Sequence, residues 1–119
     1  MTLVKNWTDL NAWQKAHQLV IEIYKITKLF PKDELYALTS QIRRAAVSIA
    51  ANIVEGFHRK TKKDRVNFYT IALTSLEEVK YYIIISKDLQ YIDVEKAREL
   101  YALCNEVGRL LRRWIQTQK

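Results

Sequence analysis

Only two glycines and one proline occur in the 119 residues of the chain, and this scarcity limits the folds it can adopt. β-Sandwiches and barrels reverse direction about every ten residues and need turn residues in proportion. Rossmann and P-loop sites need clustered glycines, whereas Gly56 and Gly108 are far apart. Hydrophobic residues make up 49% of the chain, too many for a disordered protein. The sequence therefore predicts a helical fold.

Caps and breakers divide the chain into four segments with helical periodicity, at about residues 9–30, 35–58, 63–89 and 94–116. Thr8 or Asp9 is the expected N-cap of the first helix, Pro31 its stop, and Asp93 the cap of the last. Short connections make sequential helices antiparallel. We therefore predict an all-α fold, an up-down-up-down four-helix bundle, as a single domain over residues 1–119.

The heptad spacing predicts which residues face the core of this bundle. In the third segment the predicted seam is Phe68, Ala72, Ser75, Val79, Tyr82, Ser86 and Leu89. In the fourth it is Ala97, Leu100, Cys104, Val107, Leu111 and Trp114.

The apolar surface exceeds what one four-helix core can bury. Val47 and Val54 lie away from the main seam of the second segment, and the run from Tyr81 to Ile85 points all round the third. We expect Val47, Val54, Tyr81 and Ile85 to lie between subunits of an oligomer.

A polar stripe follows one arc of the second segment: Gln41, Arg44, Ser48, Asn52, Glu55 and Arg59. It is either a solvated face with an ordinary Glu55–Arg59 ion pair, or a polar network between helices or subunits. Asn52 and Glu55 are the best candidates for a network because both border the apolar seam.

The sequence offers little for catalysis and predicts no enzyme, no catalytic residue, no metal ligand and no cofactor. His17 is expected to be packed or at an interface, and His58 to be a cation at a helix C-terminus, with a nuclease base as the weaker alternative. The lone Cys104 excludes an internal disulfide and is expected to be a buried apolar side chain.

The apolar runs are too short for a signal peptide or a membrane span, so we expect a cytoplasmic protein without a membrane partner.

Charge is the main indication of a partner, because 20 Lys and Arg against 13 Asp and Glu give a net charge of +7. One cluster lies between the second and third segments and comprises Arg59, Lys60, Lys62, Lys63 and Arg65. A second lies on the fourth segment and comprises Arg98, Arg109, Arg112 and Arg113, joined by Lys119. An antiparallel bundle places the first cluster and the Arg109–Arg113 region at one end. We therefore expect sequence-tolerant binding of RNA or DNA phosphates there.

Residues 41–56, QIRRAAVSIAANIVEG, form a distinctive string, accompanied by Phe30–Pro31 and by ALTSLEE at residues 72–78. These motifs resemble the 23S rRNA intervening-sequence protein family, small bacterial four-helix bundles. The resemblance implies a homopentamer around a central channel. The ending of the fourth segment, from Val107 to Leu111 and then Trp114–Ile115, is also similar to the accessory proteins of diversity-generating retroelements. Those are basic pentamers that bind a reverse transcriptase and nucleic acid.

The function predicted from the sequence is a non-enzymatic, oligomeric nucleic-acid-binding or RNP-assembly protein. Weak basic poles on one ring would act together through avidity. The alternative is a protein-interaction scaffold, specifically a reverse-transcriptase accessory subunit.

Overall fold

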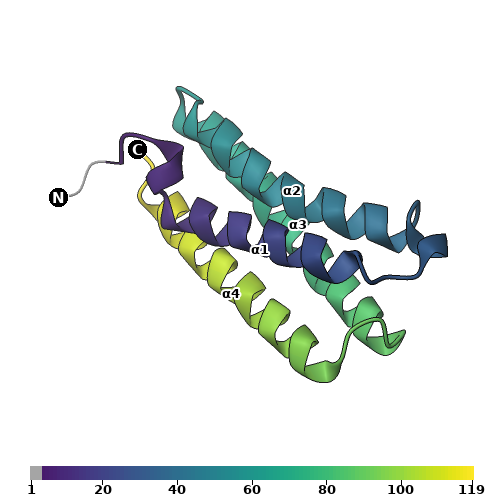
Figure 1. Ribbon diagram of the computed structural model, residues 1–119. Helices are drawn as coiled ribbons and strands as arrows, with labels where there is room; N and C mark the ends of the chain where they lie inside the picture. The colour runs from purple at the N-terminus through teal and green to yellow at the C-terminus, as the bar shows by residue number, and fades with distance from the viewer. Residues whose placement is uncertain (1–3) are drawn as a thin grey trace.

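A computed structural model describes residues 4–119, in which four α-helices and two short 3₁₀ turns form an antiparallel bundle without strands (Figure 1). The elements are η1 (Trp7–Asp9), α1 (Asn11–Thr27), η2 (Lys32–Glu34), α2 (Leu38–Phe57), α3 (Lys62–Asp88) and α4 (Val94–Gln116). The predicted all-α fold with four helices is confirmed for this part of the chain.

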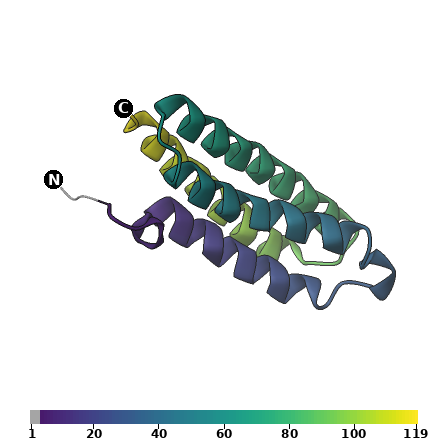
Figure 2. The same cartoon turned by 90° about the horizontal axis from the view of Figure 1, so that it is seen from above.

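The four helices form a square in cross-section, in chain order around the bundle. The α2 and α3 helices share the most extensive contact, and α1 packs against both α2 and α4. Figure 2 shows the bundle from a second side, with the α2–α3 connection and the C-terminal end of α4 at the same end. The molecule is elongated, at 45 × 25 × 19 Å.

Helix α1 begins two residues later than predicted, because Thr8 and Asp9 belong to η1 rather than acting as its N-cap. Leu10 occupies the N-cap position without a side-chain cap. The η1 turn is itself capped by the side chain of Asn6 and brings the Trp7 ring edge-on to Trp13, 4.9 Å between ring centroids. The late start of α1 thus coincides with the packing of the Trp7 and Trp13 side chains against each other.

The α1–α2 connection is longer than predicted, because α1 ends at Thr27 and α2 begins at Leu38. Phe30 lies beyond α1 and is buried, where its ring contacts Tyr91 at 5.3 Å between centroids. Helix α1 therefore ends before the predicted residue 30, and Phe30 instead packs against the α3–α4 connection. The predicted cap of α4 is confirmed, since the Asp93 carboxylate accepts a 2.7 Å hydrogen bond from the Lys96 N–H.

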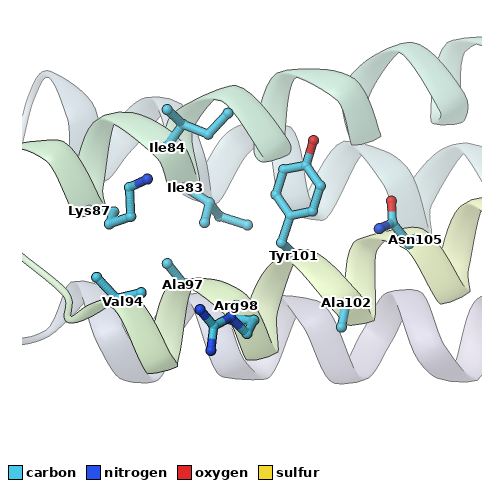
Figure 3. Close-up of a pocket in the computed structure, with 9 residues that line it drawn as sticks. All are labelled: Ile83, Ile84, Lys87, Val94, Ala97, Arg98, Tyr101, Ala102 and Asn105. Carbon is cyan, nitrogen blue, oxygen red and sulfur yellow. The ribbon is translucent and has the colours of Figure 1, made fainter.

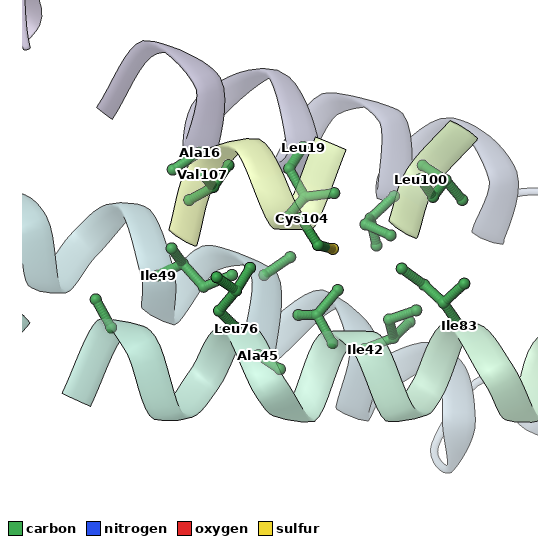
Figure 4. Close-up of a cluster of buried hydrophobic side chains, with 14 of the residues drawn as sticks. Ala16, Leu19, Ile42, Ala45, Ile49, Leu76, Ile83, Leu100, Cys104 and Val107 are labelled. Atoms are coloured by element: carbon green, nitrogen blue, oxygen red, sulfur yellow. The ribbon is translucent and has the colours of Figure 1, made fainter. Parts of the chain in front are cut away.

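The core runs the length of the bundle and contains side chains from all four helices, including Leu19, Ile49, Leu76 and Cys104 (Figure 4). In α4, the five predicted seam residues from Ala97 to Leu111 are buried, and Trp114 is half-buried. The strict 3,4 spacing of apolar residues in α4 thus correctly predicted which face of this helix is buried.

The predicted seam of α3 is wrong in register at three positions. Phe68 and Tyr82 are only half-buried and Leu89 is exposed, whereas Ala72, Ser75, Val79 and Ser86 are buried as predicted. The predicted seam missed three large buried side chains, Tyr69, Leu76 and Ile83. The contact of α3 with α2 is the most extensive in the bundle, so the buried stripe of α3 is broader than one heptad seam and does not follow one choice of spacing.

Gly56 allows α2 and α3 to approach closely near the α2–α3 connection. A Cβ atom at this position would lie 2.5 Å from Cε1 of Tyr69, whose side chain is fully buried. The absence of a side chain in α2 therefore makes room for the aromatic ring of α3.

Candidate nucleic-acid interface

The α2–α3 connection presents its basic residues from a well-formed turn. Helix α2 ends at Phe57, and Thr61 caps α3 by accepting a 3.1 Å hydrogen bond from the Asp64 N–H. The side chain of His58 is exposed, and its Nδ1 lies 2.9 Å from the carbonyl oxygen of Val54. This histidine therefore contacts the end of its own helix.

Arg65 joins this connection to the C-terminal end of α4. Its Nη1 donates to the carbonyl oxygen of Lys60 at 2.8 Å and, more weakly, to that of Arg59 at 3.4 Å. Its Nε donates to Gln118 Oε1 at 2.8 Å, and its Nη2 to the carbonyl oxygen of Lys119 at 2.6 Å. The two basic segments therefore lie side by side at one end of the bundle (Figure 1).

We call this end the basic pole and define it by seven exposed cations: Arg59, Lys60, Lys62, Lys63, Arg109, Arg112 and Arg113. Five of the seven form no ion pair with an acidic side chain in the described residues. Arg59 pairs with Glu55 at 2.9 Å, and Arg112 Nη2 lies 4.0 Å from Glu77 Oε1. Solvent-exposed pairs of this kind are weak, so they do not hold the two arginines firmly.

The α4 cations lie on different sides of their helix. Arg112 extends along its own helix over Gly108 and toward α3, where it approaches Glu77. Arg113 lines a shallow depression of about 260 Å³ against Asn11 and Ala12. The basic pole is therefore a curved surface that wraps around the end of α4.

The polar stripe contacts α3 at two described residues, Ser48 and Arg59, whose guanidinium lies 4.6 Å from the centre of the Phe68 ring. The hydroxyls of Ser48 and Ser75 lie 2.8 Å apart and connect α2 to α3. Asn52 Nδ2 donates to the carbonyl oxygen of Ser48 at 2.8 Å and to its hydroxyl at 3.0 Å, so it supports this link from within α2. Sequence reasoning placed Ser48 in the stripe and Ser75 in a seam, but did not pair them.

The other four stripe residues, Gln41, Arg44, Glu55 and Arg59, are exposed in the single chain. Glu55 forms its i,i+4 pair with Arg59. A role for Arg44, Asn52 and Glu55 between subunits stays a prediction.

Sequence reasoning missed Arg43, which connects α1 to α2. Its Nε donates to the Thr27 hydroxyl at 2.8 Å, and its guanidinium lies 4.6 Å from the centre of the Tyr24 ring. The QIRR motif contains two adjacent arginines, which project in different directions from a helix and so have different environments. Only the neighbouring helix distinguishes them.

The predicted interface residues differ in exposure. Val47 is 41% exposed and Tyr81 is 60% exposed, whereas Val54 and Ile85 are half-buried. Ile85 packs against the core of its own chain. Val47 and Tyr81 are thus the two predicted interface residues with large apolar surface still accessible.

Two buried polar atoms near the basic pole make no hydrogen bond in the structure, the Tyr69 hydroxyl and Trp114 Nε1. Burial raises the pKa of Tyr69 and outweighs the nearby charge of Arg65, which acts in the opposite direction. The phenol therefore stays neutral near physiological pH.

The remaining titratable candidates, Cys104 and His17, lie in different environments. Burial raises the pKa of Cys104 to about 12, so its side chain is a thiol at neutral pH. His17 is exposed and stacked on Trp13, with 5.0 Å between ring centroids. Within residues 4–119, no three His, Cys, Asp or Glu residues are grouped as metal binding would require.

None of the helices described here is long and apolar enough to cross a membrane.

The fold and its basic pole define a small, basic four-helix bundle, and comparison with known proteins assigns it to a family. Residues 8–113 match the model of the 23S rRNA-intervening sequence protein family, and the chain belongs to that family. The predicted family resemblance is confirmed.

A solved structure from Bacteroides thetaiotaomicron VPI-5482 is similar, with a TM-score of 0.81 and 26% sequence identity. The similarity covers 89% of this chain and 99% of the other, which is described as a protein with unknown function from the S23 ribosomal protein family. No curated protein matched the sequence.

Proposed function

We propose that this protein is a non-enzymatic, oligomeric nucleic-acid-binding protein whose basic pole contacts the phosphates of RNA or DNA. The observation that carries the proposal is the set of hydrogen bonds from Arg65 to the α2–α3 connection and to Gln118 and Lys119. These bonds bring two separate basic segments into one surface.

The chemistry of the pole supports phosphate binding over base recognition. Lys60, Lys62 and Lys63 are exposed and make no ion pair in the described chain, so phosphate binding would not require breaking one. Lysine ammonium groups on flexible stems suit contacts to a backbone of variable sequence. Arg65 differs, because its nitrogens already donate to four oxygens of the chain. We therefore assign it a positioning role at the pole.

We further propose that the protein acts as a homopentamer in the cytoplasm. The support for assembly is the apolar surface that the single bundle leaves accessible, including Val47 and Tyr81. Several copies on one ring would bind a long nucleic acid through many weak contacts, and avidity would replace a strong individual site.

The test is the salt dependence of binding to a labelled single-stranded RNA and a duplex DNA. Each phosphate contact contributes roughly −0.7 to −0.9 to the slope of log affinity against log salt. Changing Lys60, Lys62 and Lys63 together to Gln should flatten this slope and weaken binding of unrelated sequences equally. The matched control changes Lys25, Lys28 and Lys32 to Gln, which removes the same charge at the opposite end of the bundle.

Two outcomes would contradict the proposal: no binding at low salt, or equal effects of the two triple variants. Either outcome would favour the alternative function, a protein-interaction scaffold. The specific candidate partner of such a scaffold is a reverse transcriptase. If only the control variant weakens binding, the nucleic acid binds at the end of the bundle opposite the basic pole, and the proposed site is wrong.

A further inference from the structure

Three aromatic rings, those of Trp7, Trp13 and His17, lie against one another where α1 begins, and we call them the aromatic stack. The Trp7 ring is edge-on to Trp13, with 4.9 Å between centroids, and the His17 ring is nearly parallel to Trp13, at an interplanar angle of 10° and 5.0 Å. The two tryptophans are half-buried and pack against the core, whereas His17 is exposed. One face of the imidazole therefore covers Trp13, and the other face is accessible from solvent.

The aromatic stack lies at the same end of the bundle as the basic pole. Helices α1 and α2 are antiparallel, so the first turns of α1 lie at the level where α2 ends and the α2–α3 connection begins (Figure 2). The η1 turn, which contains Trp7, contacts α2, and the first turn of α1 lines a depression together with Arg113 of the pole. A chain bound to the exposed lysines of the connection can therefore extend onto the rings.

A second flat surface lies on the α3 side of α2. The guanidinium of Arg59 lies 4.6 Å from the centre of the Phe68 ring, and the Arg59 side chain is exposed. Unpaired bases stack on guanidinium planes as well as on aromatic rings. Two stacking surfaces thus flank the end of α2, the aromatic stack toward α1 and the Arg59–Phe68 pair toward α3.

The charge at this end suits a polyanion. The acidic side chains of η1 and of the first turn of α3 are Asp9 and Asp64, against the seven cations of the basic pole. Proteins that bind single strands combine cations for the backbone with flat side chains for the bases. The bases of a duplex are paired and stacked on one another, so they do not reach rings on a protein surface in this way.

Cations and an aromatic ring also meet in a groove of about 460 Å³ between α3 and α4. Figure 3 shows Tyr101 and Arg98 extending from α4 and Lys87 from α3. These cations have acidic partners, Asp88 at 3.6 Å from Lys87 and Glu95 at 3.2 Å from Arg98. The lysines of the α2–α3 connection have no such pair in the described residues, so the basic end is the better site for a nucleic acid.

We propose that the ligand of the basic pole is a single-stranded nucleic acid, whose phosphates contact the lysines while its bases stack on His17 and on Arg59. The inference rests on the phosphate binding of the proposed function and adds the form of the nucleic acid. Stacking tolerates any sequence, because every base has a π-face. The preference is therefore for unpaired bases and not for a particular base.

The first test compares an oligothymidylate strand with an abasic strand of the same length, by fluorescence anisotropy at one low salt concentration. The two strands have the same phosphates and differ only in their bases. The thymine strand should bind at least about fivefold more tightly, which is the lower end of what one stacked base contributes. Equal affinity for the two strands would overturn the inference.

The second test assigns the stacking to His17. His17→Ala should weaken binding of the thymine strand about fivefold or more and leave the affinities for the abasic strand and for a duplex unchanged. His17→Phe keeps a flat ring without the imidazole nitrogens and should restore tight binding. The matched control is Tyr101→Ala, which removes a ring beside the cations of the α3–α4 groove and should change no affinity. Circular dichroism checks that each variant keeps its helices.

The third test separates the plane of Arg59 from its charge. Arg59→Lys keeps the charge and removes the flat guanidinium, so it should weaken binding of the thymine strand and leave that of the abasic strand unchanged. Equal weakening of both strands would show that Arg59 contacts phosphate only, and would overturn its stacking role.

The outcomes separate this inference from the proposed function. If neither strand binds the unmodified protein, phosphate binding by the basic pole is wrong and the inference fails with it. If both strands bind equally and the triple lysine variant weakens both, phosphate binding stands and stacking alone is wrong. If the preference for the thymine strand survives His17→Ala, or is lost in Tyr101→Ala, the assignment of the bases to the aromatic stack is wrong.

Discussion

Gln90 is the one non-glycine residue with a left-handed backbone among the residues described, at φ 63°. It follows the C-terminus of α3, where the Tyr91 N–H bonds to the Ser86 carbonyl at 2.8 Å and the Gln90 N–H to the Lys87 carbonyl at 2.9 Å. These two bonds form a Schellman motif, in which glycine is the favoured residue at this position.

Gln90→Gly should therefore stabilise the protein by about 0.5–1 kcal/mol, because glycine adopts this conformation without the steric cost of a Cβ. Urea unfolding measures the change. Gln90→Ala is the control, since alanine keeps the Cβ and should give no gain. Equal stabilisation by both changes would show that backbone strain is not the cause.

Gly56→Ala should destabilise the protein by about 1–3 kcal/mol, because the added methyl group overlaps the buried Tyr69 ring. Thermal and urea unfolding report the loss. Gly108→Ala is the matched comparison within a helix and should cost less: there the added Cβ lies 2.9 Å from the flexible end of Arg112 and 3.2 Å from Leu76 Cδ2. A loss at Gly108 as large as that at Gly56 would argue against the role of the Tyr69 ring.

Cys104 should make the protein less stable in alkali. Its pKa is raised from 9.0 to about 12 by burial, so above pH 9 the unfolded chain loses the thiol proton while the native protein keeps it. The free energy of unfolding then falls as pH rises between these values, by up to about 1.4 kcal/mol per pH unit. Comparing the pH dependence of urea unfolding with that of Cys104→Ala isolates this contribution; parallel curves above pH 9 would contradict it.

At the scale of the elements, Arg65 connects three parts of the chain at the basic pole. Arg65→Gln should loosen the last turn of α4 and the α2–α3 connection together, because hydrogen bonds from a charged donor to Gln118 Oε1 and the Lys119 carbonyl are lost. We expect faster amide hydrogen exchange in both segments and a loss of about 1–3 kcal/mol in stability.

The control for Arg65→Gln is Lys63→Gln, which removes the same charge from an exposed side chain of the same helix. It should lower nucleic-acid affinity and leave hydrogen exchange near Gln118 unchanged. If both variants affect only affinity, Arg65 is one more phosphate contact and has no positioning role.

At the scale of the whole molecule, Val47→Glu should yield smaller species than the unmodified protein. The side chain is 41% exposed, so the single bundle tolerates a carboxylate there, whereas an interface between copies would bury an unpaired charge. Native mass spectrometry reports the species, and binding measured on the same sample should show a shallower salt slope because fewer poles act together. An unchanged mass would place Val47 outside the interface.

Local features of the sequence were enough to predict the helices of the bundle. The 3,4 spacing in α4 gave its buried face, and Asp93 gave its start, because periodicity and capping involve residues within a few turns of one another. The basic clusters were also visible, since the predicted antiparallel order placed both at one end.

The tertiary structure decided what depends on neighbouring helices. The register of α3, the contact of Gly56 with Tyr69 and the link between Ser48 and Ser75 all arise where α2 and α3 meet. Arg65 resembled its basic neighbours in the sequence, but the structure directs its donors to oxygens 53 and 54 residues away. A sequence pattern specifies the environment that one helix requires, whereas the partner of each side chain is fixed only when separate helices pack together.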